Sequence, residues 1–183
     1  ASAAPRYSAS NSRHVQSNKT EDRMLANALS GLKVIDFTQV MAGPTCTLCM
    51  ADLGADVVKI EAPAGDLSRA LSPWVQGEGV AFMALNRNKR SVVLDLKHPE
   101  HLQAAQALVA QADVLVESFR PGVMARLGLD YAAVSAGNPR LIYCSVSAYG
   151  QHGASRDLPG VDGVLQAVSG LMSVTGARDG EPC

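Results

Sequence analysis

The chain has 183 residues, of which 47% are hydrophobic and 18% charged, and its formal net charge is −1. This composition is typical of one globular domain with a buried core and excludes a disordered chain. Near-neutral charge, 4% aromatic residues and the lack of any apolar run near the ~18 residues that span a bilayer argue against nucleic acid and membrane as partners.

Residues 1–28 differ from the rest of the chain. They are rich in Ser, Ala, Asn and Arg and show no apolar periodicity. We expect a loose or processed segment, either the remnant of an organellar transit peptide or a disordered terminal extension of a bacterial protein. The four cysteines, at 46, 49, 144 and 183, are too few and too unevenly spaced for a disulfide framework. A reducing compartment is therefore expected. The choice between the cytoplasm and the mitochondrial matrix rests on the first residues of the chain, and the cytoplasm is preferred.

From residue 32 onward, short β-branched runs alternate with helical patterns. Strands are predicted at 32–38, 55–63, 89–97, 113–119 and 139–150. Helices are predicted at 43–54, 98–112, 121–129, 130–138 and 163–176, with a loop-like region at 64–79. The alternation predicts an α/β fold, a Rossmann-like, mostly parallel sheet with helices on both faces. Because such sheets bind ligands at the carboxyl ends of their strands, the loops of interest are 38–44, 61–69, 94–98, 117–126 and 148–162.

Several common sites are disfavoured by the turn after the first strand, "DFTQVMAGPTCT". It carries Gly43 alone, whereas a dinucleotide site needs three glycines so that a pyrophosphate can approach the backbone. The chain contains no G-x-x-x-x-G-K-[ST] motif, which excludes a P-loop. It also has no serine in a G-x-S-x-G elbow, so no Ser–His–Asp hydrolase is predicted.

Two short motifs could bind metal or carry thiol chemistry. Cys46 and Cys49 form a C-x-x-C at a helix start, but no second pair exists, so packing as small apolar residues is favoured. His98 and His101 form an H-x-x-H with no third ligand, so a solvated surface is favoured. The sequence therefore predicts no metal site.

Charged residues near strand ends leave alternatives open. The cations of "NRNKRS", Arg87, Lys89 and Arg90, suit either a phosphate site or a solvated basic turn. Arg120 and Arg126 follow the fourth strand and suit either an anionic ligand or a helix cap. Asp162 precedes an apolar helix and is either a site carboxylate or an N-cap.

Five stretches in order resemble the amino-terminal half of family III CoA-transferases. They are "LKVIDFTQVMAGPTCTLCMADLGADVVKIEAPAGDLSR", "NRNKRSVVLDLKHPE", "ADVLVESFRPGVMARLGLDY", "NPRLIYCSVSAYGQHG" and "PGVDGVLQAVSGLMSVTG". This group includes formyl-CoA, carnitine, bile-acid and glutarate CoA-transferases, and α-methylacyl-CoA racemases share its fold. The resemblance implies that residues 29–183 are the amino-terminal part of the large domain of an interlocked homodimer. The turn-rich end "SVTGARDGEPC" is likewise expected of a truncated chain.

The resemblance also implies which residues bind CoA. Met41 and Ala42 follow the first strand, and Arg126 is a phosphate- or adenine-side contact. The family often has a basic residue where this chain has Ala62, and Asn where it has Ser118. The remaining implied CoA-binding residues are Leu94, Asp95, Leu96 and Lys97 after the third strand, Ser118, Phe119 and Arg120 after the fourth, and Pro159, Gly160 and Val161 near the thioester.

The activity implied by the resemblance is transfer of CoA from an acyl-CoA to a carboxylic acid through enzyme-bound anhydride and thioester intermediates. CoA is then a substrate, and no tightly bound cofactor is expected. The family's nucleophilic aspartate is expected beyond Cys183, which makes Asp162 an auxiliary carboxylate. The racemases have Gly-His-Asp here, and Val161 cannot move a proton as their histidine does, so a transferase is preferred. The alternatives are a racemase-type enzyme or a catalytically inactive CoA-binding fragment.

Overall fold

The computed structural model describes residues 27–181, so nearly all of the predicted loose segment 1–28 lies outside the described residues. Five parallel strands form the main sheet in the order β5-β2-β1-β6-β7. They are β1 (Lys33–Phe37), β2 (Asp56–Glu61), β5 (Arg90–Val93), β6 (Val114–Glu117) and β7 (Ile142–Ser145). The predicted parallel α/β sheet is confirmed, and each predicted strand is present.

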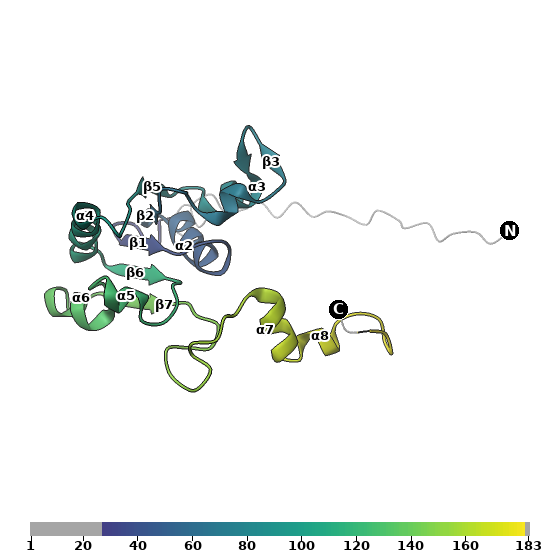
Figure 1. Cartoon of the computed structure of the whole chain (residues 1–183). Helices are drawn as coiled ribbons and strands as arrows, with labels where there is room; N and C mark the ends of the chain where they lie inside the picture. Colours follow the sequence, from purple (N-terminus) through teal and green to yellow (C-terminus); the bar gives the residue numbers. More distant parts are fainter. Residues whose placement is uncertain (1–26, 182–183) are drawn as a thin grey trace.

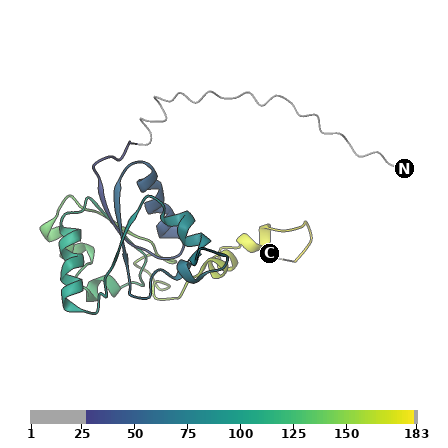
Figure 2. The ribbon, with the colours of Figure 1, turned by 90° about the horizontal axis from the view of Figure 1, so that it is seen from above.

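Helices cover both faces of this sheet (Figures 1 and 2). One face carries α2 (Ala42–Asp52) and α3 (Val80–Asn86), and the other carries α4 (Pro99–Ala110), α5 (Val123–Arg126) and α6 (Tyr131–Gly137). Alternate residues of β1 enter different cores, because successive side chains of a strand point to opposite faces. Val34 packs beside Ala51 on the α2 side, while Ile35 and Phe37 pack with Ala105 and other residues on the α4 side.

The region between β2 and β5 is more regular than the loop predicted at 64–79. It contains a 3₁₀ turn (Leu67–Ala70), a short antiparallel hairpin of β3 (Trp74–Val75) and β4 (Glu78–Gly79), and then α3. Helix α3 was not predicted, because the run "VAFMALN" shows no helical periodicity of polar and apolar residues. Only Asn86 of this helix is fully buried.

Several helix boundaries differ from the predictions, and α5 is shorter than the helix predicted at 121–129. Helix α2 begins at Ala42, so Pro44 lies within its first turn, and it ends before Gly54, which has φ +93°. The single helix predicted at 163–176 is two short helices, α7 (Asp162–Val168) and α8 (Leu171–Val174). Gly170 separates them in a left-handed conformation with φ +80°, which a helix cannot continue. Both helices project away from the sheet (Figure 1).

Candidate functional site

The loops after β1 and β6 meet where the strand order reverses. The chain crosses from β1 to β2 on one side and enters the sheet again through β6 on the other, and ligands bind doubly wound sheets at such a point. The backbone N–H of Gln39 donates to Ser118 Oγ at 3.3 Å. The rings of Phe37 and Phe119 lie 6.5 Å apart. Ser118 and Phe119 are therefore adjacent to the loop that carries Met41 and Ala42.

The loop after β5 lies at the same edge of the sheet. The Leu94 N–H donates to the Glu61 carbonyl at 2.8 Å, which places residues 94–97 beside the end of β2. Leu94 is buried, and Leu96 packs with Phe119 against the same core. Asp95 Oδ1 accepts from the Lys97 N–H at 3.0 Å, which closes a tight turn. The structure thus brings together the predicted CoA-binding residues of three loops.

His98 and His101 follow this turn, at the start of α4. Both are exposed, as predicted, with ring centroids 5.0 Å apart. His101 Nδ1 accepts a hydrogen bond from the Asp95 N–H at 3.1 Å. This histidine therefore orders the turn. Within residues 27–181, no group of three or more His, Cys, Asp or Glu side chains is arranged to hold a metal ion.

Three cations near these loops form no ion pair with any described residue. Lys97 follows β5, while Arg120 and Arg126 follow β6, and all three are exposed. Arg126 folds back, since its Nη1 atom lies 3.7 Å from where a Cβ on Gly122 would be. Six other cations are paired with carboxylates: Lys59, Arg69, Arg87, Lys89, Arg90 and Arg156. Lys97, Arg120 and Arg126 are therefore available to an anionic ligand.

The three cations of the basic turn 86–91 are paired with carboxylates of the fold. The turn precedes β5 and so lies at the amino edge of the sheet, opposite the loops described above. Arg87 pairs with Asp52, and Arg90 pairs with Asp56 at 2.7 Å. Lys89 is not solvated either: its side chain is 1% exposed, and Nζ contacts Asp36 Oδ2 at 3.1 Å. The predictions of a phosphate-binding Lys89 and of a solvated Lys89 are therefore both wrong, because its ammonium group is buried against the carboxylate of Asp36.

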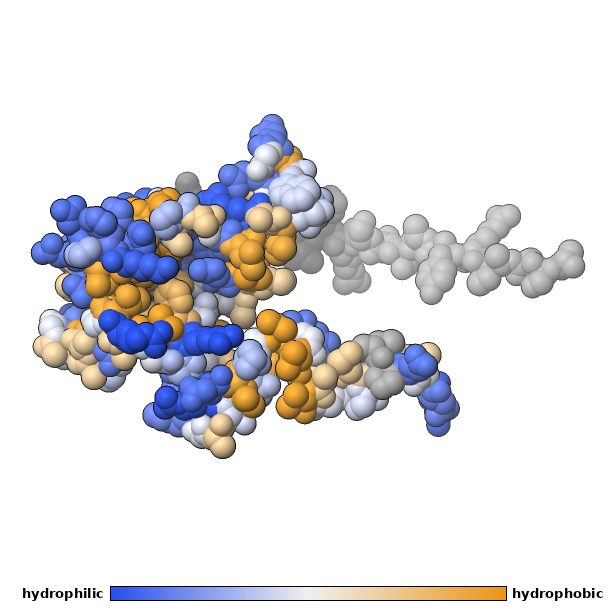
Figure 3. All heavy atoms as spheres, in the orientation of Figure 1, coloured by the Kyte–Doolittle hydropathy of each residue, from blue (hydrophilic) through white to orange (hydrophobic). Residues whose placement is uncertain are grey.

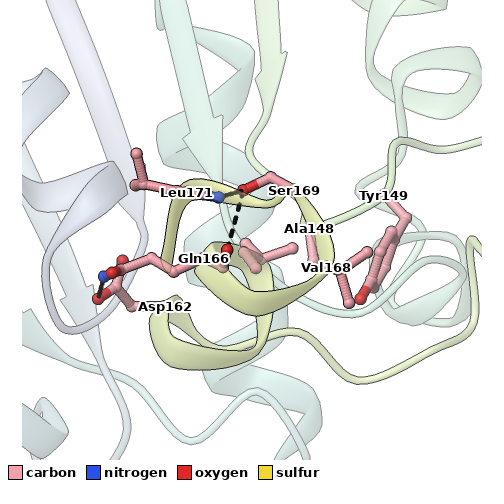
Figure 4. Close-up of a pocket in the computed structure, with 8 residues that line it drawn as sticks. Ala148, Tyr149, Asp162, Gln166, Val168, Ser169 and Leu171 are labelled. Atoms are coloured by element: carbon pink, nitrogen blue, oxygen red, sulfur yellow. Dashed lines mark hydrogen bonds between the residues drawn. The ribbon is translucent and has the colours of Figure 1, made fainter. Parts of the chain in front are cut away.

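Asp162 lies on the segment that follows β7 and carries α7. It is the first residue of α7, and Val161 occupies the N-cap, so the alternative of Asp162 as the N-cap is wrong. The carboxylate accepts a hydrogen bond from Gln166 Nε2 at 2.6 Å. Together with Ala148, Tyr149 and neighbouring α7–α8 residues, Asp162 lines a hollow of about 420 Å³. Figure 4 shows the Asp162–Gln166 pair at one end of this hollow and Tyr149 at the other.

Residues 159–161 are fixed by a close contact with the segment after β7. A Cβ on Gly160 would lie 2.2 Å from the Cβ of Ala148, so only glycine allows this approach. Pro159 is exposed, and Val161 is 68% exposed. These three residues adjoin the Asp162 hollow rather than the loops after β1, β5 and β6.

The expected packing of the α2 cysteines is wrong. Cys46 and Cys49 are exposed, because the helical period turns Thr47, Leu48 and Ala51 toward the sheet instead. Partial burial, with Cys144 and Cys49 nearby, raises the pKa of the Cys46 thiol. The raised pKa does not favour a redox role. Cys144 is half-buried and packs against the core on the α2 side, as expected.

Sequence reasoning missed a buried network of charges on the α2 side of the sheet. Lys59 pairs with Asp66 at 2.7 Å, and both side chains are at most 1% exposed. Arg69 binds Glu61 through two hydrogen bonds, of 2.7 and 2.8 Å. Burial alone would raise the pKa of Glu61, yet hydrogen bonds from Arg69, Ser91 and the Asp66 N–H lower it to about 2. The sequence does carry a signal of this network, because charged residues stand inside the apolar strand runs "KVIDF" and "DVVKIE".

The chain is similar to known proteins in both sequence and structure. Residues 29–183 match the model of CoA-transferase family III. The chain is 44% identical to succinate–glutarate CoA-transferase of Agrobacterium fabrum over 84% of its length, which is 40% of that relative. It is 46% identical to acetyl-CoA:oxalate CoA-transferase of Acetobacter aceti over 83% of its length, which is 39% of that relative.

A solved structure supports the same assignment. The crystal structure of a CAIB/BAIF family protein from Brucella suis superposes with a TM-score of 0.82 at 40% identity, over 86% of this chain and 43% of that one. The chain thus spans about two fifths of the length of the relatives it matches. Among the described residues, no helix combines the length and apolarity needed to cross a membrane. The ordered motifs, the parallel sheet and these similarities establish that the chain belongs to CoA-transferase family III.

Proposed function

We propose that the chain carries the CoA-binding part of an enzyme that moves CoA from an acyl-CoA thioester to a carboxylic acid. CoA is a substrate here, and no tightly bound cofactor is proposed. One observation carries the proposal: the loops after β1, β5 and β6 lie at one sheet edge, and the segments that follow β5 and β6 carry Lys97, Arg120 and Arg126, which form no ion pair within residues 27–181. Guanidinium and ammonium groups are the donors that the phosphates of CoA require.

The proposed chemistry divides into binding and reaction. Met41, Ala42 and residues 94–97 and 118–120 hold CoA, with Arg126 on the phosphate or adenine side. The acyl donor reacts with an aspartate to form a mixed anhydride and CoA thiolate, and the thiolate then attacks the aspartyl carbonyl, which forms an enzyme–CoA thioester and releases the donor acid. The acceptor carboxylate attacks this thioester to form a second anhydride and CoA thiolate. The thiolate then attacks the acyl carbon of the acceptor, which releases the acceptor's CoA ester and the free aspartate. Such anhydrides hydrolyse, so the complete site must exclude water.

Asp162 is proposed as an auxiliary carboxylate near the thioester. Its exposed position and single hydrogen bond with Gln166 support this role, because a carboxylate has further acceptor positions for substrate groups. Val161, the neighbouring N-cap residue, carries no group that can abstract a proton. This observation favours a transferase over a racemase-type enzyme.

We also propose a homodimer in the cytoplasm. Apolar side chains project from the segment around α7 and α8, where Figure 3 shows them gathered on the surface. They are Leu158, Val161, Val164, Val168, Leu171 and Val174, each at least 43% exposed. Apolar surface of this extent favours association. The cysteine pattern supports a reducing compartment, and the three described cysteines are free thiols.

The test is calorimetric titration of the chain with CoA, 3′-dephospho-CoA and pantetheine. We expect CoA to bind more tightly than either analogue, because each lacks phosphate groups that the cations would contact. Equal binding of CoA and pantetheine would contradict the proposed phosphate contacts. Activity assays distinguish the transferase from a racemase-type enzyme and from an inactive binding module. Transfer of CoA between two acids supports the transferase, exchange of the α-proton of a 2-methylacyl-CoA in D₂O supports a racemase, and binding without either supports an inactive binding module.

A further inference from the structure

The turn between β1 and α2, residues 38–41, is held by one buried ion pair. Lys59 Nζ donates to the Thr38 carbonyl at 2.7 Å and pairs with Asp66 Oδ2 at 2.7 Å. Asp66 Oδ1 accepts from the Val40 N–H at 3.2 Å. The ion pair therefore forms hydrogen bonds with the peptide groups on both sides of Gln39.

The residue held in this way has an unfavourable backbone conformation. Val40 has φ +68°, in the left-handed region that β-branched residues avoid. Such a conformation persists only when surrounding contacts determine it. Here those contacts come from β2 and from the turn that follows it, not from the β1–α2 turn itself.

Asp66 is itself fixed by its neighbours. Its Oδ1 atom accepts from the Ser68 N–H at 2.8 Å and from Ser68 Oγ at 2.7 Å. The Asp66 N–H donates to Glu61 Oε2 at 2.9 Å, and Arg69 holds the same carboxylate. The side chain of Asp66 therefore cannot move without disrupting the end of β2.

We infer that the Lys59–Asp66 ion pair positions the CoA-binding residues Met41 and Ala42 by holding Val40 in its left-handed conformation. Lys59 and Asp66 are fully buried, so they touch no ligand and act only through the turn. The ion pair can do this because residue 41 follows Val40 directly and α2 begins at Ala42. The inference rests on the proposed function only in taking CoA as the ligand of this loop.

The test replaces the pair by apolar residues of similar volume, Lys59→Met with Asp66→Leu, since such replacements usually preserve the fold. We expect this double variant to keep the helical circular dichroism of the wild type and to bind CoA about tenfold more weakly in calorimetry, as loss of the support for one strained residue predicts. Adding Val40→Gly should recover most of that loss, because glycine adopts positive φ without strain. Rescue by a glycine at residue 40 is not expected if the pair only stabilises the fold.

A matched control removes an ion pair at the opposite edge of the sheet. Arg90→Gln with Asp56→Asn also deletes one charge of each sign, and CoA affinity should not change. Wild-type affinity in the Lys59→Met, Asp66→Leu variant, or a loss that Val40→Gly does not repair, would overturn the inference. If that variant does not fold, Lys59→Met with Asp66→Asn keeps the Ser68 hydrogen bonds and should show a smaller loss in the same direction.

A second measurement separates this inference from the proposed function. NMR can measure hydrogen exchange of the Val40 amide without any ligand. The exchange rate reports whether the Lys59–Asp66 ion pair, the clamp of the β1–α2 turn, holds this amide. We expect a protected amide in the wild type and faster exchange in the Lys59→Met, Asp66→Leu variant. If the wild type binds no CoA, the proposed function fails while the exchange data still test the clamp. Unchanged exchange in the variant overturns the clamp even if CoA binds.

Discussion

Thr38 and Gly43 pack so closely that a Cβ on Gly43 would lie 2.3 Å from the Cβ of Thr38. This contact seats the first turn of α2 directly on the end of β1. It explains why glycine stands at this position although its backbone does not have a positive φ. The single glycine in the first βα turn thus has a packing role, distinct from the three-glycine pattern that admits a pyrophosphate.

Replacing Gly43 by alanine should destabilise the protein. The added methyl group overlaps Thr38, and overpacking of this kind costs about 1–3 kcal/mol. Urea denaturation of Gly43→Ala should therefore show a lower midpoint than the wild type. Gly163→Ala is the control, because a Cβ there meets no atom within 4 Å. Equal midpoints for the two variants would contradict the close contact.

Glu61 should make stability depend on acid pH. Its pKa is about 2 in the folded protein against an ordinary value of 4.5, so the ionised form is favoured by folding. The stabilisation is complete above pH 4.5 and is lost as pH falls toward 2, with a limit on the order of 3 kcal/mol. Denaturation between pH 6 and pH 2.5 should show a shallower decline for Glu61→Gln than for the wild type.

Glu78→Gln provides the matching control for this pH dependence. Glu78 also contacts Arg69, at 2.9 Å, but its side chain is 46% exposed. Solvent screens such a pair, so its removal should change the acid profile little. A wild-type slope in Glu61→Gln would show that other carboxylates dominate the acid response.

Neutralising the edge cations should weaken CoA binding. Arg126→Gln and Lys97→Gln each remove one charged donor, so the dissociation constant should rise about tenfold at low salt. The effect should shrink as the salt concentration rises, because exposed charges are screened. Arg140→Gln is the control, since Arg140 is exposed and forms no ion pair with the described residues but precedes β7 at the amino edge. An equal effect of all three substitutions would indicate nonspecific attraction.

The cysteines should differ in reactivity. Cys46 and Cys49 are exposed on α2, whereas Cys144 is half-buried. In the native protein, both α2 thiols should therefore label with iodoacetamide before Cys144, as site-resolved mass spectrometry can follow. Burial raises the pKa of Cys46, so its labelling should accelerate as pH rises above 7.5. Faster labelling of Cys144 than of Cys49 would contradict the packing of β7.

The sequence alone determined the fold class and predicted the edge of the sheet at which a ligand would bind. Local patterns suffice for this, because strand and helix periodicities are properties of short segments and parallel strands present their ends together. The motifs also predicted that residues 41–42, 94–97 and 118–120 belong to one site. The structure places these loops together at that edge, as the contacts of Gln39 with Ser118 and of Leu94 with Glu61 indicate.

Only the tertiary structure decided which charges are free and which are used inside the fold. In the sequence, Lys89 and Arg126 are both cations near strand ends and both suit an anionic ligand. In the structure, Lys89 is buried against Asp36, whereas Arg126 remains exposed and unpaired within the described residues. Lys59 and Asp66 likewise became recognisable as a pair only when β2 and the following turn were seen to enclose them. The physical reason is that a charge is neutralised by its neighbours in space. Those neighbours come from segments far apart in the chain, which no local pattern records.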